Sequence, residues 1–315
     1  MKKIVLKLAL ALSALGLFCT SASAAEKPRV VVTIFPQYDF VREIAGDRVD
    51  LTMLLRPGSE SHSFEPTPQD IMKIRNSDLF VCVGGESDKW VDRILDSMET
   101  KKFQTLRLME MIVPLEEEIV PGMQAPEEDD DHDHSHDEVE LDEHVWTSPA
   151  NAQHIVRTLS EALSEIDPGN ADAYRANAAA YIARLGALDG EFKALIDGGV
   201  RRTLVFGDKF PFRYFAHRYG LTYYAAFPGC STETEASAAT VAFLIDKARE
   251  EKIPVVFHIE LSSGRMADAI CESTGAKKRM LHSCHNISRD DFQRGAGYLE
   301  LMKRNVSALR EALYR

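Results

Sequence analysis

The chain has 315 residues, five cysteines and a formal net charge of −12, and 45% of its residues are hydrophobic. This length is enough for two domains with cores of their own. The acidic balance excludes a nucleic-acid-binding surface as the general character of the protein, and five cysteines are too few for a disulfide-built scaffold. Residues 116–143 hold 14 Asp and Glu and no Lys or Arg, so one segment carries most of the acidity.

The first 25 residues have the pattern of an export signal. Three lysines come before the apolar run 8–18, which is too short to span a bilayer, and the small residues 22–24 fit a cleavage site. We therefore expect residues 1–25 to be removed and the mature protein to be periplasmic or otherwise extracytoplasmic. A lipid anchor at Cys19 is the alternative, and the bulky Phe18 before it argues against that reading.

Four cysteines follow the signal. Cys82 lies in the apolar run LFVCV and is expected to be a buried core thiol. The other three come later in the chain, and an oxidising compartment permits one disulfide among Cys230, Cys271 and Cys284.

Residues 29–115 alternate between strand and helix patterns, which predicts a mostly parallel sheet covered by helices. The expected strands are 29–34, 49–54 and 79–83, and the expected helices are 36–45, 68–76 and 88–98.

His62 lies in the stretch RPGSESHSFEPTPQD, between one of these strands and one of these helices. Thr67, Pro68 and Asp70 have the spacing of a capped helix start. Ligands in α/β folds bind beyond strand ends, in the position that this stiff loop occupies. A single loop histidine is nevertheless more often merely solvated than functional.

Residues 116–143 break the alternation. This acidic, His-rich run lacks apolar periodicity and is expected to be a disordered loop. Its histidines, His132, His134 and His136, either capture divalent metals weakly or belong to a solvated acidic run. His144 comes directly after it and enters the segment HVWTSPA, in which Ser148 and Pro149 start a helix that runs to about residue 166.

A long amphipathic helix of roughly 28 residues follows Asp167-Pro168, because apolar residues recur at spacings of three and four up to Leu195. The strand and helix alternation then resumes. Strands are expected at 203–206, 221–227, 254–259 and 276–281, and helices at 210–219, 234–251, 262–273 and 290–314. The fold class is therefore α/β with two lobes, each a mostly parallel four-stranded sheet flanked by helices, joined by a long spine helix.

The chain resembles the solute-binding proteins of ABC importers for zinc and manganese. The resemblance covers nearly the whole mature chain and lies in GSESHSFEPTPQDI (58–71), LFVCVGGESDKW (79–90), EHVWTSP (143–149), RYFAHRYGL (213–221) and ESTGAKKRML (272–281). It implies an N-terminal lobe at 26–166, a linking helix at 167–197 and a C-terminal lobe at 198–315. It also implies a metal bound between the lobes and a partner permease in the membrane.

The resemblance carries over His62 and His144 as the first two metal ligands. Where the family has a third histidine this chain has Gly207, and the late carboxylate is matched by His282. Asp208, beside Gly207, and His282 are therefore the candidates from the second lobe, and the runners-up are Cys230, Glu260 and His285.

Three imidazoles and one carboxylate favour Zn²⁺ as the transported ion, because Mn²⁺ prefers more oxygen ligands. The resulting prediction is a monomeric zinc-binding protein, not an enzyme, that serves an ABC permease. A manganese-binding member of the family and a metal-binding surface adhesin are the alternatives. A zinc hydrolase is disfavoured because neither H-E-x-x-H nor G-x-S-x-G occurs.

Overall fold

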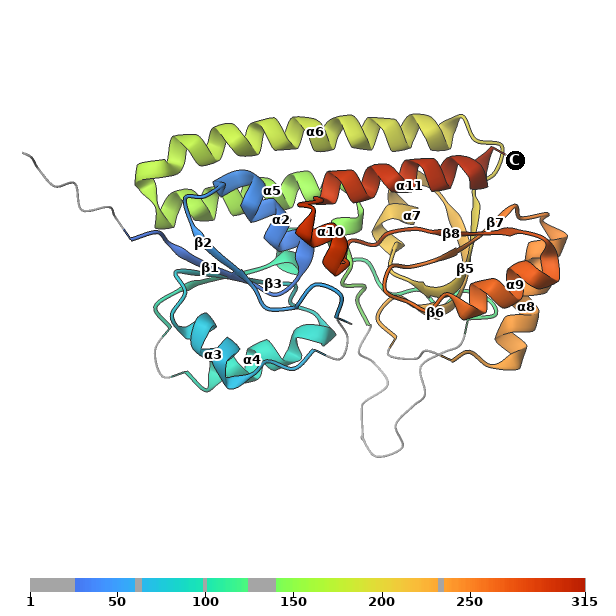
Figure 1. Cartoon of the computed structure of the whole chain (residues 1–315), viewed down its shortest axis with the longest axis horizontal. Coiled ribbons are helices and arrows are strands. Elements are labelled where there is room, and N and C mark those ends of the chain that lie inside the picture. The colour runs from blue at the N-terminus through green and yellow to red at the C-terminus, as the bar shows by residue number, and fades with distance from the viewer. Residues whose placement is uncertain (1–25, 60–63, 99–100, 124–139, 232–234, 315) are drawn as a thin grey trace, which may run out of the picture.

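The computed structural model describes residues 26–59, 64–98, 101–123, 140–231 and 235–314. The expected export signal, His62 and the histidines at 132, 134 and 136 lie outside these residues. Two lobes stand side by side in Figure 1, with the long helix α6 (Ala171–Asp197) running along both of them. None of the helices in the described ranges is long and apolar enough to cross a bilayer.

The first lobe is built on a parallel sheet with strand order β2-β1-β3-β4. Its strands are β1 (Arg29–Val32), β2 (Asp50–Met53), β3 (Leu79–Cys82) and β4 (Gln104–Arg107), and its helices are α2 (Phe35–Ala45), α3 (Pro68–Arg75), α4 (Lys89–Asp96) and α5 (Pro149–Ile166). The central strand β3 is buried on both faces, as expected for a parallel sheet covered by helices. The pattern does not predict β4, whose residues are all half-buried and partly polar.

The second lobe repeats this plan with strand order β6-β5-β7-β8, again parallel. Its elements are β5 (Thr203–Phe210), α7 (Arg213–Tyr219), β6 (Thr222–Pro228), α8 (Ala238–Glu250), β7 (Val255–His258), α9 (Arg265–Thr274), β8 (Lys277–Met280), α10 (Arg289–Gln293) and α11 (Tyr298–Leu313). The predicted fold class, with two four-stranded lobes and a spine helix, is confirmed. The exact domain limits stay a prediction.

The spine helix buries the face that its spacing predicts. The buried residues include Tyr174, Ala178, Tyr181, Leu185, Leu188, Phe192 and Leu195. They belong to one apolar core that also contains residues of both sheets. Burying this stripe against both lobes stabilises the helix far more than its intrinsic propensity does.

Three expectations need correction. The closing helix predicted at 290–314 is two helices, because Gly295 has a φ of 74° and Gly297 begins α11 in an extended conformation. The four described cysteines are free thiols, so the disulfide that the sequence permits among Cys230, Cys271 and Cys284 is not formed in this structure.

The third correction concerns the acidic segment 116–143, which is not irregular along its whole length. Its two ends pair through an antiparallel bridge between Glu116 and Leu141. The N–H of Glu117 donates to the carbonyl of Glu140 at 2.9 Å, and that of Asp142 donates to Leu115 at 2.9 Å. Backbone pairing satisfies polar groups that a charged composition alone would leave to water.

Candidate metal centre

A cavity of about 640 Å³ lies between the two lobes. The first lobe contributes Ser59 and His144, and the second lobe contributes His285 and Asn286 together with the ends of β5 and β7. Its position at the carboxyl ends of strands agrees with the general rule for ligand sites in α/β sheets.

His144 is fully buried and directly precedes a short 3₁₀ helix, η3 (Val145–Thr147). Its N–H donates to Asp142 Oδ1 at 2.8 Å, and its ring Nδ1 lies 3.4 Å from the same oxygen. Burial alone would lower the pKa of His144, but the Asp142 carboxylate outweighs burial and raises it. A carboxylate beside Nδ1 favours the tautomer with its proton there, which leaves Nε2 as the atom able to bind a metal.

The residue before His144 is also held tightly. The Glu143 carboxylate accepts hydrogen bonds from the N–H of Ser87 at 2.8 Å and from the Ser87 hydroxyl. Burial raises the pKa of Glu143 to about 7, against the effect of these hydrogen bonds. The Glu143 side chain also lies close to Gly85, because a Cβ added to Gly85 would be 2.4 Å from the Glu143 side chain. The backbone leading into His144 is therefore fixed on both sides.

His285 brings a second imidazole to the same place from the other lobe. It is 7% exposed, and its ring centroid lies 5.2 Å from that of His144 in an edge-to-face arrangement. Trp146 packs against both rings, with centroid distances of 5.4 Å to His144 and 5.0 Å to His285. The Trp146 indole N–H also donates to the carbonyl of Ser283 at 2.9 Å, which ties η3 to the loop that carries His285.

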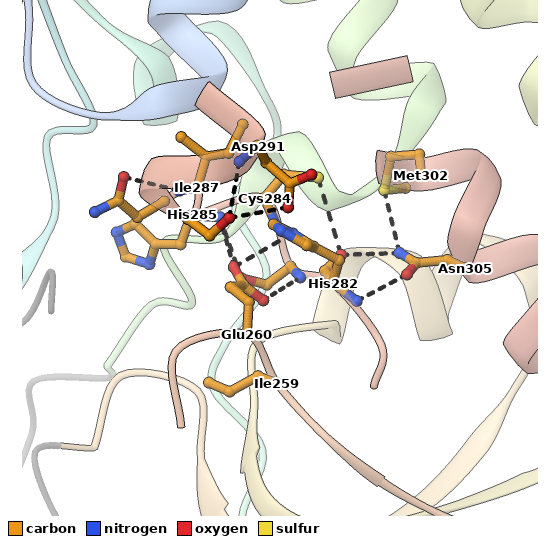
Figure 2. Close-up of polar contacts among 12 residues, drawn as sticks. Ile259, Glu260, His282, Cys284, His285, Ile287, Asp291, Met302 and Asn305 are labelled. Carbon is orange, nitrogen blue, oxygen red and sulfur yellow. Dashed lines mark hydrogen bonds and ion pairs between the residues drawn. The ribbon is translucent and has the colours of Figure 1, made fainter. Parts of the chain in front are cut away.

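His282 is buried but is not among the residues that line the cavity. Its ring Nδ1 accepts a hydrogen bond from the N–H of Cys284 at 3.0 Å. An imidazole nitrogen that accepts a hydrogen bond carries no proton, so the neutral ring has its proton on Nε2. The polar contacts that hold His282 and the loop around it are drawn in Figure 2.

Asp208 reaches the cavity from β5, but its carboxylate has other partners. It accepts hydrogen bonds from the N–H of the next residue, Lys209, at 2.9 Å, from the N–H of Ile259 at 3.3 Å and from the Ser262 hydroxyl. Asp208 thus holds the turn that follows β7.

Glu260 also lines the cavity, and its carboxylate serves the His285 loop. It accepts hydrogen bonds from the N–H of Ser283 at 2.7 Å, from the Ser283 hydroxyl at 2.6 Å and from the N–H of His285 at 3.2 Å. The sequence alone makes Glu260 a possible ligand and does not reveal these contacts, because no pattern along the chain links residue 260 to residues 283–285.

Cys230 follows β6, and its N–H donates to Glu117 Oε1 at 3.1 Å. Burial, with the carboxylates of Asp142, Glu143 and Glu117 nearby, raises the pKa of the Cys230 thiol well above its usual range. A thiol in such surroundings resists forming the thiolate that binds metals.

The segment that leads to His62 is anchored to the second lobe. The side-chain amide of Asn286 donates to the carbonyls of Arg56 and Ser59 at 2.9 and 2.7 Å. Asn286 is the neighbour of His285, and Ser59 lies three residues before His62 in the chain. Within the described ranges, which omit 60–63, no three His, Cys, Asp or Glu residues form a group that could hold a metal.

Comparisons with known proteins agree with this architecture. The family model described as zinc-uptake complex component A, periplasmic (ZnuA) matches residues 30–312. The zinc-binding lipoprotein AdcA of Streptococcus pneumoniae is 30% identical over 312 residues, which are 99% of this chain and 61% of AdcA, so the chain spans about three-fifths of that relative. The high-affinity zinc uptake system protein ZnuA of Bacillus subtilis is 32% identical over 291 residues, covering 92% of this chain and 89% of the relative.

A solved structure shows the same fold. The Zn(II)-bound ZnuA-like domain of Streptococcus pneumoniae AdcA matches with a TM-score of 0.75 at 28% identity, covering 92% of this chain and 100% of that domain. The family match extends over both lobes and the spine helix. This chain therefore belongs to the ZnuA family of periplasmic zinc-uptake components.

Proposed function

We propose that this protein captures Zn²⁺ outside the cytoplasm, in the cavity between its lobes, and delivers it to the membrane permease of an ABC importer. The observation that carries the proposal is the meeting of two imidazoles, His144 and His285, from opposite lobes at 5.2 Å between ring centroids. Membership of a zinc-uptake family supports transport rather than catalysis. A monomer with one tight site is the expected active form.

The proposed ligand set is His62, His144 and His285. His62 is included because its motif resembles the family and because the described residue Ser59 reaches the cavity. His285 takes the place first given to His282, since it faces His144 and lines the cavity. Three imidazoles leave one position of a tetrahedral zinc for an oxygen ligand.

Asp208 and His282 have supporting roles in this proposal. The carboxylate of Asp208 is engaged by the turn after β7, and the Nδ1 of His282 is engaged by Cys284. Zinc on His282 would have to displace the proton of Nε2, because Nδ1 accepts the N–H of Cys284, and three hydrogen bonds already hold the Asp208 carboxylate at the turn. A donor set dominated by imidazole favours zinc over manganese.

The first prediction is that one tight zinc site disappears when either proposed imidazole is removed. His144→Ala and His285→Ala should each weaken zinc binding by orders of magnitude in competition titrations against a chelator, because water replaces a fixed donor. The matched control is His154→Ala, since His154 is exposed on α5 and should leave the affinity unchanged. Tighter binding of manganese than zinc, or equal affinity in all three variants, would contradict the proposal.

A further inference from the structure

The loop from Leu281 to Ile287, which carries His285, has an unusual backbone. Cys284 has a φ of 62°, in the left-handed region that residues with a Cβ seldom adopt. This conformation costs about 1 kcal/mol or more, so the surrounding contacts must impose it. The conformation matters for the site because Cys284 directly precedes His285.

His282 supplies the contact that shapes this turn. Its Nδ1 accepts the N–H of Cys284, two residues later, at 3.0 Å. A side-chain acceptor bonded to the N–H two residues on is the arrangement that Asn and Asp make in an Asx turn. His282 is itself fixed by Asn305 of α11, which accepts the N–H of His282 at 2.7 Å and donates to its carbonyl at 2.8 Å.

Glu260 holds the other side of the loop. Its carboxylate accepts the N–H and the hydroxyl of Ser283 and the N–H of His285, which holds the backbone two residues before the proposed ligand and at the ligand itself. Figure 2 shows Glu260 beside the loop that carries His285. The carboxylate also lies 3.6 Å from His282 Nδ1, so the two side chains meet inside the turn. Both are more than nine-tenths buried, which shields these contacts from competing water.

We infer that His282 and Glu260 are positioning residues: they shape the 281–287 turn so that the His285 ring reaches zinc, and His282 does not itself bind the ion. Metal ligands must be held to within about 0.5 Å of a productive geometry, which a turn with one left-handed residue cannot ensure without side-chain support. The competing reading, zinc on His282 Nε2, requires the ring to lose its Nε2 proton while Nδ1 still accepts from Cys284.

This inference rests on the proposed function, and substitution by asparagine separates the two readings of His282. The side-chain oxygen of asparagine can accept the N–H of residue 284 in an Asx turn, but it cannot replace an imidazole as a zinc ligand. We therefore expect His282→Ala to weaken zinc binding about 10–100-fold, as is usual when a group that orients a metal ligand is lost. His282→Asn should restore affinity to within about threefold of the parent.

Three further measurements strengthen the test, and the last of them controls for folding. Glu260→Gln should weaken zinc binding about 10–100-fold, because in either orientation its amide N–H₂ would face one of the two backbone donors, the N–H of Ser283 or that of His285. The visible spectrum of bound Co²⁺, which reports the ligand set, should be the same for His282→Asn as for the parent and altered for His285→Asn. Thermal unfolding without metal tests whether each variant is folded. If His282→Ala is unfolded, the zinc affinities of His282→Asn and Glu260→Gln decide between the two readings of His282.

The outcomes separate this inference from the proposed function. A loss of affinity in His282→Asn as large as in His285→Asn, with a changed Co²⁺ spectrum, would identify His282 as a ligand and overturn the inference. Parental affinity in both His282→Ala and Glu260→Gln would also overturn it. Parental affinity in His144→Ala and His285→Ala would instead refute the proposed site itself.

Discussion

Gly207 shows how closely β5 packs against α9 beside the cavity. A Cβ added to Gly207 would lie 2.6 Å from both the Cα and the N of Ala267. Backbone atoms cannot give way as a flexible side chain can, so no larger residue fits without moving the helix. The position at which the family resemblance places a histidine is thus closed by packing, which agrees with the imidazole of the second lobe coming from the loop after β8.

At the residue scale we predict that Gly207→Ala lowers the free energy of unfolding by about 1–3 kcal/mol, through overpacking against Ala267. Chemical denaturation of the metal-free protein measures this change. Gly190→Ala is the matched control, because nothing lies within 4 Å of its added Cβ in α6. That substitution should stabilise the helix by about 0.5–1 kcal/mol. A Gly207→Ala protein as stable as the parent would show that α9 can shift freely.

At the scale of elements, an ion pair fastens the spine helix to the second lobe. Arg218 of α7 donates to both carboxylate oxygens of Asp189 in α6, at 2.9 and 2.6 Å, and the Tyr219 hydroxyl donates at 2.8 Å. Burial alone would raise the pKa of Asp189, but the hydrogen bonds from Arg218 and Tyr219 outweigh burial and lower it. The folded state therefore holds this carboxylate ionised more strongly than the unfolded chain does.

The sign of the pH effect follows from that lowered pKa. The contribution of Asp189 is fully present above the unfolded pKa of about 4, and it is lost as the pH falls through the lower folded value. Asp189→Asn should destabilise the protein by about 1–3 kcal/mol at pH 7, and its difference from the parent should shrink below about pH 4. Urea denaturation across this pH range measures the difference. A gap that stays constant down to pH 2 would refute the prediction.

The comparison variant for this experiment is Asp172→Asn on the same helix. Asp172 pairs with Arg175, but its side chain is fully exposed, so the pair is screened by water. Its replacement removes a charge from the first turn of α6 and should change stability only slightly, by less than the effect expected for Asp189→Asn.

At the scale of the whole molecule, the two lobes are joined by more than the spine helix. The N–H of Tyr298, at the start of α11, donates to Asp39 of α2 at 2.7 Å, and its hydroxyl donates to the carbonyl of Trp146 at 2.7 Å. The C-terminal helix thus returns to the first lobe beside the proposed metal site. Trp146, whose carbonyl accepts this hydrogen bond, also packs against the rings of both His144 and His285.

The two ends of the acidic segment 116–143 lie side by side, at Glu116 and Leu141. Because Glu116 pairs with Leu141, a short linker can replace residues 126–138 without moving His144. We predict that this deletion leaves the affinity of the tight zinc site within about threefold and removes only additional weak sites, since it keeps the paired ends of the segment that lead into His144. Isothermal titration measures both stoichiometry and affinity.

A full-length variant with Ser at positions 132, 134 and 136 separates the effect of the histidines from that of loop length. It should behave like the deletion. Loss of the tight site in either protein would make the loop histidines primary ligands and would contradict the assignment to His62, His144 and His285.

The sequence by itself determined the features that depend on neighbours along the chain. The alternation of strands and helices, the Thr67 cap of α3 and the buried stripe of α6 all follow from local spacing, and the structure confirms each. His144 could be recognised because its motif stands next to a clear helix start. These features are readable because periodic burial and capping act over a few residues.

Tertiary structure alone decided which residues face one another. His282 and His285 are three residues apart in one loop, Cys284 between them has a left-handed backbone, and it is the His285 ring that lies against His144. The paired ends of the acidic segment likewise depend on a contact between residues far apart in the chain. Long-range packing, hydrogen bonds and desolvation set these choices, and none of them leaves a pattern at the spacing of a helix or a strand.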